Sequence, residues 1–273
     1  MSDADCVAFL QWALPRLHLS WRGFRKVRRQ VCRRVERRRG ELGLADLAAY
    51  RAYLEQRSEE WGRFDEFCRI TISRFYRDRG VFGFLEREVL PALAREAIAR
   101  GESAVRAWSA GCASGEEPYT LTVVWELALA PLFPSLALHV LATDLDETML
   151  RRAHEACYEP SSLKELPEHW RERAFVQRDG LYCLRAQFRR RVRLLRHDVR
   201  GAPPRGPFDL VFCRNLAFTY FDPELQREVA RGLTASLHPG GALIVGAHEA
   251  VPEGVAGLAP WPGIRCVYRT CAS

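Results

Sequence analysis

The feature that most constrains how this chain can fold is a change in its hydrophobic rhythm near Gly101. Before this point, apolar residues recur every three or four positions, which is typical of helices, and no strand signal appears. After it, short apolar runs alternate with helical segments, which predicts a parallel, doubly wound sheet. Strands are expected at 104–110, 138–143, 192–195, 210–213, 242–245 and 265–268, with helices at about 117–130, from 147, and at 224–236.

The same change predicts two domains. We expect a small N-terminal helical domain at residues 1–78 and an α/β domain at residues 79–273, in which residues 79–100 form a connecting helix. A composition of 48% hydrophobic and 11% aromatic residues can bury a core, which excludes global disorder. No apolar run reaches the length of about 18 residues that indicates a membrane span. The acidic amino terminus lacks the layout of a signal peptide, so we expect a cytoplasmic protein.

The nine cysteines indicate neither a disulfide framework nor a zinc site. They are odd in number, scattered, and never spaced Cys-x-x-Cys. We therefore expect buried reduced thiols, as in a cytosolic protein. The histidines at 139, 197, 238 and 248 also lack the spacing of metal ligands, so we expect no bound metal.

One segment carries the excess positive charge of the chain. The formal net charge is +7, yet residues 16–39 hold eleven Lys or Arg side chains against one acid, so the rest of the chain is slightly acidic. A helix from Ser20 to about Gly40 would gather its apolar residues on one side. The opposite side would carry a basic stripe of Arg22, Lys26, Arg29, Arg33 and Arg37. Such a stripe is compatible with a solvated face, a surface for acidic helices, or nucleic-acid binding.

The segment Ser109–Tyr119 predicts a ligand-binding turn after the first strand. Ligands of open α/β sheets bind beyond the carboxyl ends of the strands, and Gly111 and Gly115 let the backbone turn sharply there. Asp144 ends the next strand, where a carboxylate can accept hydrogen bonds from both ribose hydroxyls of an adenosine-containing cofactor. The alternative is that these residues are only turn glycines and a helix N-cap.

The chemistry of this turn favours S-adenosylmethionine over a nucleotide. The turn lacks the Gly-x-Gly-x-x-Gly and Gly-x-x-x-x-Gly-Lys patterns that hold a pyrophosphate or a triphosphate. Its adjacent acids, Glu116 and Glu117, would repel phosphates. They suit the ammonium and sulfonium charges of S-adenosylmethionine.

Five motifs, in order along the chain, resemble those of the CheR-type chemotaxis receptor methyltransferases, which methylate glutamates with S-adenosylmethionine. The first strand and its turn, Trp108–Tyr119, match almost letter for letter. The other four are Thr71–Arg77, Ala142–Asp146, Phe208–Asn215, and Pro239–Gly246 with Glu249. The resemblance covers nearly the whole chain. It implies a Rossmann-like S-adenosylmethionine-dependent methyltransferase domain behind the small helical domain.

The resemblance also implies cofactor-binding residues. The cofactor, and its product S-adenosylhomocysteine, would be bound by Thr71, Ser73, Arg77, Gly111, Glu117, Asp144, Asp198, Val199, Arg214 and Asn215. Among these, Glu117 and Asp144 would hold the amino-acid and ribose portions. The chain departs from the family pattern at Thr71, Ser73 and Asp198.

On the acceptor side, the candidate catalytic residues are Arg77, Arg214 and Tyr220. The arginines can steer an anionic acceptor toward the methyl group, and Tyr220 can donate a hydrogen bond to a carboxylate oxygen. Alternatively, Arg77 only pairs with the cofactor carboxylate, and Tyr220, which stands one residue later than the family's tyrosine, is a packed aromatic. No general base is needed, because a glutamate with a pKa of about 4.3 is already ionised at neutral pH.

The leading hypothesis is a protein-glutamate O-methyltransferase whose basic helix at Arg22–Arg37 docks on an acidic, chemoreceptor-like helical protein. A nucleic-acid partner is not expected, because the sequence contains no base-stacking or base-reading module. Two alternatives stay open. One is a methyltransferase of the same fold with a small carboxylate or an N/O nucleophile as acceptor, and the other is a non-catalytic module that senses the cofactor. The oligomeric state does not follow from the sequence.

Overall fold

The computed structural model describes residues 2–271 and separates into two compact units. The smaller unit contains the chain up to Ile70 together with residues 219–226, and the larger unit contains residues 71–218 and the chain from Arg227 onward. A short segment from the far end of the sequence therefore completes the N-terminal unit.

The division falls at Ile70 instead of the expected residue 78. The physical reason is that the intervening segment is hydrogen-bonded within the larger unit. The amide of Phe75 donates to the Ser162 carbonyl at 2.9 Å, and the amide of Tyr76 donates to Thr120 Oγ1 at 3.0 Å.

The smaller unit is helical, as the sequence predicts. Its core contains a cluster of buried rings, in which Phe9 lies 5.8 Å from Tyr50 and 5.6 Å from Phe64 between ring centroids. The helices are α1 (Asp3–Ala13), the 3₁₀ helix η1 (Leu14–Leu17), α2 (Trp21–Phe24), α3 (Arg28–Glu41), α4 (Leu47–Gln56) and α5 (Ser58–Phe67).

The single basic helix expected from Ser20 to about Gly40 is wrong, because residues 25–27 form a turn between α2 and α3. The side chain of Ser20 makes no capping hydrogen bond, and its amide donates to the Tyr220 carbonyl at 2.8 Å. The returning segment 219–226 thus engages the backbone before α2. A helical periodicity in the sequence does not reveal this tertiary contact.

The expectation that all cysteines are reduced thiols is also wrong. Cys6 of α1 is disulfide-bonded to Cys32 of α3, and Cys157 is bonded to Cys183. Both pairs join segments that only the tertiary fold brings together, so spacing along the chain does not indicate them. The remaining cysteines are free, and only Cys271 among them is exposed.

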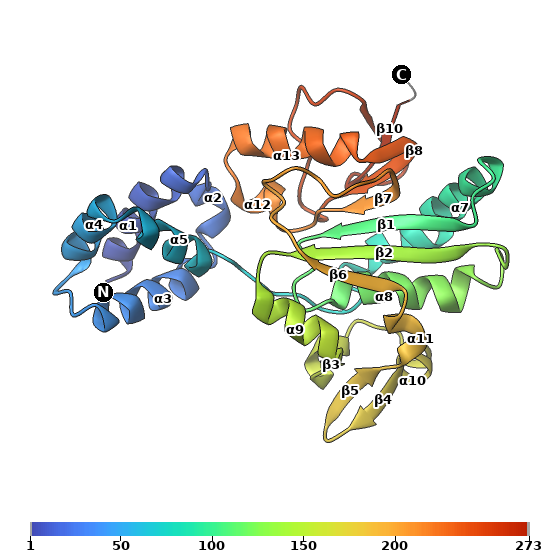
Figure 1. Cartoon of the computed structure of the whole chain (residues 1–273), viewed down its shortest axis with the longest axis horizontal. Helices are drawn as coiled ribbons and strands as arrows, with labels where there is room; N and C mark the ends of the chain where they lie inside the picture. The colour runs from blue at the N-terminus through green and yellow to red at the C-terminus, as the bar shows by residue number, and fades with distance from the viewer. Residues whose placement is uncertain (1, 272–273) are drawn as a thin grey trace. The chain divides into compact units, whose positions relative to one another are not determined.

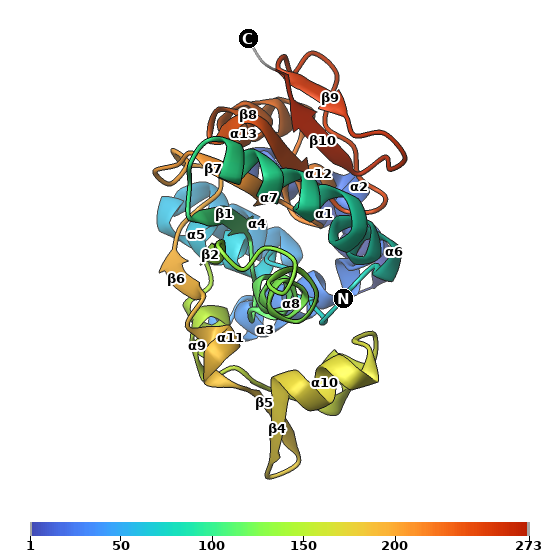
Figure 2. The same ribbon diagram turned by 90° about the vertical axis from the view of Figure 1, so that its right-hand side faces the viewer.

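The larger unit contains a seven-stranded sheet with strand order β6-β2-β1-β7-β8-β10-β9 (Figures 1 and 2). Strands β6, β2, β1, β7 and β8 are parallel, and β10 pairs antiparallel with both β8 and β9. The order reverses beside β1, which has β2 on one side and β7 on the other. This confirms the predicted α/β fold. The strands are β1 (Ala104–Ala110), β2 (Ala137–Asp144), β6 (Val192–Arg196), β7 (Phe208–Phe212), β8 (Leu237–Ile244), β9 (Leu258–Pro260) and β10 (Val267–Thr270).

Helices connect these strands. A long helical stretch precedes β1, and α8 and α9 follow β1 and β2. No helix within residues 2–271 has both the length and the apolar character needed to cross a membrane. The elements are α6 (Arg79–Phe84), the π-helix η2 (Leu85–Val89), α7 (Leu90–Ala99), α8 (Glu116–Val124), the π-helix η3 (Trp125–Leu129), α9 (Glu147–Glu155), α12 (Ala217–Tyr220) and α13 (Pro223–Ala235).

A second, three-stranded antiparallel sheet with order β3-β5-β4 lies between β2 and β6 in the sequence. It projects beyond α9 and α11 in both views (Figures 1 and 2). Sequence reasoning did not predict it, because strands of two to four residues carry too little periodicity. Its elements are β3 (Cys157–Tyr158), the 3₁₀ helix η4 (Pro160–Leu163), α10 (Glu168–Ala174), β4 (Phe175–Arg178), β5 (Leu181–Leu184) and α11 (Ala186–Arg189).

Candidate functional site

The predicted ligand-binding turn lies at the carboxyl ends of β1 and β2, where the strand order reverses. Gly111 and Gly115 have φ angles of +78° and +92°, a backbone conformation that favours glycine. The amides of Gly111 and Cys112 donate to the Thr143 carbonyl at 2.8 and 2.9 Å. These bonds hold the turn against the last residues of β2.

Asp144 ends β2, and both of its carboxylate oxygens contact backbone amides. Oδ2 accepts from Ala113 at 2.8 Å, and Oδ1 accepts from Asp146 at 2.9 Å. Ala113 has a φ of +47°, which is uncommon for a residue other than glycine. Asp144 therefore orders the turn after β1, and its carboxylate lies where the sequence predicts contact with a ribose.

A chain of polar contacts joins β1, α8 and the end of β7. Ser109 Oγ donates to Glu117 Oε1 at 2.8 Å, and Arg214 Nη1 donates to Glu117 Oε2 at 3.2 Å. Nη2 of the same guanidinium donates to Asp78 Oδ2 at 2.6 Å and to the Arg77 carbonyl at 3.1 Å. Arg214 thus links the Glu117 carboxylate to the segment that contains Arg77.

Burial raises the pKa values of the two adjacent carboxyls in the turn. For Glu117, desolvation raises the pKa, and Arg214 opposes this effect by favouring the ionised form. For Glu116, desolvation again raises the pKa, while hydrogen bonds from Ser114 and Ser73 oppose it. A cation near these carboxyls would lower both pKa values, which agrees with a ligand that carries an ammonium and a sulfonium.

The donors of the site also fit the carboxylate of S-adenosylmethionine. The side chain of Arg214 is only 2% exposed, yet its Nε has no hydrogen-bond partner within residues 2–271. A buried donor without an acceptor is costly. An anionic acceptor group of a ligand would remove that cost. The site thus offers carboxyl groups for the ammonium and sulfonium of S-adenosylmethionine and a guanidinium for its carboxylate.

The segment from Thr71 to Asp78 contributes its predicted residues to the same unit. Ser73 contributes to lowering the pKa of Glu116 against the effect of burial, and Arg77 Nη1 donates to the Ile72 carbonyl at 2.8 Å. Tyr76 and Asp78 have φ angles of +56° and +64°. Left-handed residues other than glycine cost energy and cluster at functional sites, which supports a role for this segment. Thr71 begins the segment and is half-buried.

Asp198 and Val199, predicted beside the adenine, follow β6. The carboxylate of Asp198 accepts hydrogen bonds from Arg200 Nε at 3.0 Å and from Arg200 Nη2 at 2.7 Å. Val199 lines a cavity of about 220 Å³ together with Trp108 and Leu233. Asn215 lies next to Arg214 in the turn after β7.

Tyr220 belongs to the smaller unit, whereas the other predicted site residues belong to the larger unit. Its ring lies 4.9 Å from that of Phe24 between centroids. This contact supports the alternative that Tyr220 is a packed aromatic residue. Its catalytic role stays a prediction.

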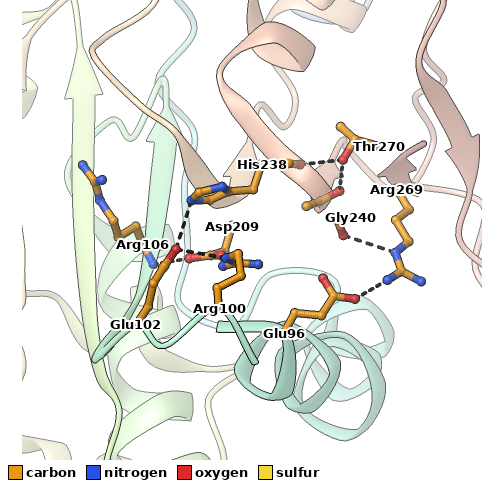
Figure 3. Close-up of polar contacts among 10 residues, drawn as sticks. Glu96, Arg100, Glu102, Arg106, Asp209, His238, Gly240, Arg269 and Thr270 are labelled. Atoms are coloured by element: carbon orange, nitrogen blue, oxygen red, sulfur yellow. Dashed lines mark hydrogen bonds and ion pairs between the residues drawn. The ribbon is translucent and has the colours of Figure 1, made fainter. Parts of the chain in front are cut away.

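One group of side chains has the spacing of metal ligands, which the histidine pattern did not suggest. Atoms of Glu102, Asp209 and His238 lie within 4.8 Å of one another. Arg100 donates to both Glu102, at 3.0 Å, and the buried Asp209 (Figure 3). The guanidinium thus supplies the positive charge here. The group lies at the amino ends of β1, β7 and β8, opposite the predicted site.

The basic segment divides into inward and outward cations. The inward ones contact acids or carbonyls of their own unit: Arg28 pairs with Asp3 at 3.0 Å and Arg38 with Glu60 at 2.8 Å, and Arg34 donates to two carbonyls. The outward ones are exposed and form no ion pair within residues 2–271. They are Arg22, Arg25, Lys26, Arg29 and Arg33, and from here on the basic stripe means these five. Arg37, which the sequence placed in the stripe, is not among them, because it lies 3.6 Å from Glu41.

Three residues of the site were not predicted to act there. Ser109 and Asp78 hold Glu117 and Arg214, and Glu249 holds the backbone of Asn215. Ser109 lies within the motif Trp108–Tyr119, and Glu249 belongs to the motif that begins at Pro239. Asp78 directly follows the motif Thr71–Arg77. No pattern in the sequence, however, indicates which groups they contact.

Comparison with known proteins finds a match over the part of the chain that contains most of these residues. Residues 71–259 match the family profile of the CheR methyltransferase, SAM binding domain, where SAM is S-adenosylmethionine. The chain is 35% identical over 190 residues to the "Chemotaxis protein methyltransferase" of Listeria monocytogenes, covering 68% of this chain and 69% of that protein. It is 33% identical over 233 residues to the protein of the same name from Salmonella typhimurium, covering 81% and 76%.

A further relative is much longer than this chain. The chain is 33% identical over 224 residues to the "Uncharacterized 104.1 kDa protein in hypE 3'region" of Rhodobacter capsulatus. The match covers 82% of this chain and only 23% of that protein.

Proposed function

Because this chain belongs to the CheR methyltransferase family, we propose that it transfers a methyl group from S-adenosylmethionine to glutamate side chains of an acidic, chemoreceptor-like helical protein. The family, the methyltransferase activity and S-adenosylmethionine as cofactor are confirmed by the match over residues 71–259 and by the chemotaxis methyltransferases among the relatives. The acceptor and the roles of individual residues are our proposal.

The observation that carries the proposal is the Glu117–Arg214 pair, with Ser109 and Asp78 on its two sides. Glu117 would accept a hydrogen bond from the ammonium of the cofactor, and Asp144 would accept from the ribose hydroxyls. Arg214 would bind the cofactor carboxylate through its unsatisfied Nε. Gly111, Asn215, Asp198 and Val199 would contact the remaining parts of the cofactor.

When bound, the cofactor supplies a methyl group on a sulfonium, which an anionic oxygen can displace in line. The residues of the chain then need only align the acceptor and exclude water, which can contribute about 7–11 kcal/mol through effective concentration. Arg77 would attract an acceptor carboxylate, and Thr71 and Ser73 would close over the cofactor. The role of Tyr220 as a hydrogen-bond donor to an acceptor carboxylate stays a prediction from the resemblance.

The basic stripe supports an acidic partner. Its five cations are exposed and make no internal ion pair, whereas their neighbours Arg28, Arg34, Arg38 and Arg39 are engaged within the unit. Cations that the fold does not use remain available for a partner, and they raise its association rate by electrostatic steering. We therefore propose that the basic stripe docks on helices rich in glutamate.

A cytoplasmic location is part of the proposal. Stable disulfides are rare in that compartment. The pairs Cys6–Cys32 and Cys157–Cys183 are therefore the observation that speaks against it.

Incubation with methyl-labelled S-adenosylmethionine and the helical signalling domain of a chemoreceptor tests the proposal. We expect label on the receptor domain that is released as methanol by mild base, because carboxyl methyl esters are base-labile. The matched control is the same domain with its glutamates replaced by glutamine, which should take up no label.

Two results would contradict the proposal. Base-stable label would indicate a nitrogen or another oxygen acceptor. Calorimetric binding of S-adenosylmethionine without label on any acidic helix would indicate a non-catalytic module.

A further inference from the structure

The carboxylate of Glu249 contacts the turn that contains Arg214 and Asn215. Its Oε2 accepts a hydrogen bond from the Asn215 amide at 2.8 Å and another from the Gly246 amide at 2.6 Å. One oxygen thus joins the turn after β7 to the turn after β8. The cysteine before Arg214 extends this link, because the Cys213 amide donates to the Ile244 carbonyl at 2.9 Å.

Asn215 has a left-handed backbone beside this contact. Its φ is +55°, in the region that asparagine adopts more readily than most residues with a side chain. Gly246 allows the close approach: a Cβ there would lie 2.6 Å from Glu249 Oε2 and 2.7 Å from Asn215 Nδ2. A residue larger than glycine at 246 would therefore push Glu249 and Asn215 away.

We infer that Glu249 is a positioning residue of the cofactor site, which holds the Arg214–Asn215 turn so that the guanidinium of Arg214 meets Glu117. The inference rests on the proposed function of that site. Glu249 acts through the backbone and need not touch the cofactor. A carboxylate suits this task because an ionised oxygen accepts stronger hydrogen bonds from two amides than a neutral acceptor does.

The test compares three variants of the full chain. Glu249→Ala removes the acceptor, Glu249→Gln keeps an amide oxygen that can accept both hydrogen bonds, and Glu253→Ala removes an exposed carboxylate nearby on the chain as the matched control. The readouts are the affinity for S-adenosylmethionine by calorimetry, the Tm, and hydrogen exchange of the amides of Asn215 and Gly246.

We expect Glu249→Ala to weaken S-adenosylmethionine binding by about tenfold or more, since a displaced Arg214 would lose a charge-assisted hydrogen bond to the cofactor carboxylate and one such bond is of that size. Exchange at Asn215 and Gly246 should become faster in the same variant. Glu249→Gln should bind within about threefold of the unsubstituted chain, and Glu253→Ala should not differ from it.

Unchanged affinity in Glu249→Ala, with a lowered Tm or faster exchange, would overturn the inference and leave Glu249 a purely structural residue. The variant Asp144→Ala distinguishes a failure of this inference from a failure of the proposed cofactor site. If Asp144→Ala weakens binding and Glu249→Ala does not, only the inference falls. If neither variant weakens binding, the proposed cofactor site is wrong as well.

Discussion

Asp144 accepts hydrogen bonds from two backbone amides, and a carboxylate can accept about four in total. The two backbone bonds are therefore compatible with ribose hydroxyls as additional donors. The same side chain would order the turn after β1 and bind the cofactor, so its removal should affect both. The adjacent Glu117 differs, because Ser109 and Arg214 hold it by side-chain contacts only.

At Asp144, we expect substitution by alanine to weaken S-adenosylmethionine binding at least tenfold. Hydrogen bonds to charged groups contribute about 1.5–3 kcal/mol each, and about 1.4 kcal/mol corresponds to a factor of ten. Asp144→Asn should lose less, because it keeps one acceptor oxygen. Titration calorimetry measures both. Asp146→Asn is the control, since Asp146 caps α9 and asparagine caps equally well.

Helices α3 and α5 of the smaller unit are joined by a buried ion pair. Glu60 is 3% exposed and accepts from Arg38 at 2.9 and 2.8 Å and from the Tyr50 hydroxyl at 3.0 Å. These hydrogen bonds lower the pKa of Glu60 below its usual value of 4.5. A lowered pKa means that the pair stabilises the folded unit above about pH 4.5. The contribution is lost as the pH falls through the pKa of the folded state.

For this helix pair, we expect Arg38→Met to destabilise the smaller unit by about 3–5 kcal/mol at pH 7, because a buried carboxylate is left without a cation. The loss should shrink as the pH falls and Glu60 of the variant becomes protonated. Hydrogen exchange of the α3–α5 amides across this pH range measures the effect. The exposed Arg37, which lies 3.6 Å from Glu41, is the control. An equal loss in Arg37→Met would contradict the assignment.

Over the whole molecule, positive charge and cofactor chemistry lie in different units. The basic stripe belongs to the smaller unit, and the Glu117–Arg214 pair belongs to the larger unit. Docking and cofactor binding should therefore be separable by mutation. This separation is compatible with the proposed macromolecular acceptor.

Reversal of two charges of the basic stripe, Arg29→Glu with Arg33→Glu, should lower methylation of a chemoreceptor domain by tenfold or more at low salt. The effect should decrease as salt is added, because salt screens exposed charges. The affinity for S-adenosylmethionine should not change. The matched control reverses two exposed arginines elsewhere in the smaller unit, Arg57 and Arg63. If the control lowers methylation as much, or if cofactor affinity falls too, the stripe is not a docking surface.

The sequence was sufficient to predict most strands of the main sheet. Strands β1, β2, β6, β7 and β10 lie within two residues of their expected bounds, and β8 begins five residues earlier than expected. Buried parallel strands produce short apolar runs, and their order places loop residues such as Gly111 and Asp144 at one edge. These are local signals, and the family match agrees with them.

Other features were decided by contacts between distant residues. The break between α2 and α3 accompanies the return of residues 219–226, and the two disulfides join segments that lie 26 residues apart. The contacts of Arg214 with Asp78 and Glu117 span 136 and 97 residues. Periodicity and spacing report only on neighbours along the chain. The sequence therefore determined most elements of the main sheet and the family, whereas the tertiary structure decided which charged groups meet, because burial and pairing depend on distances in space.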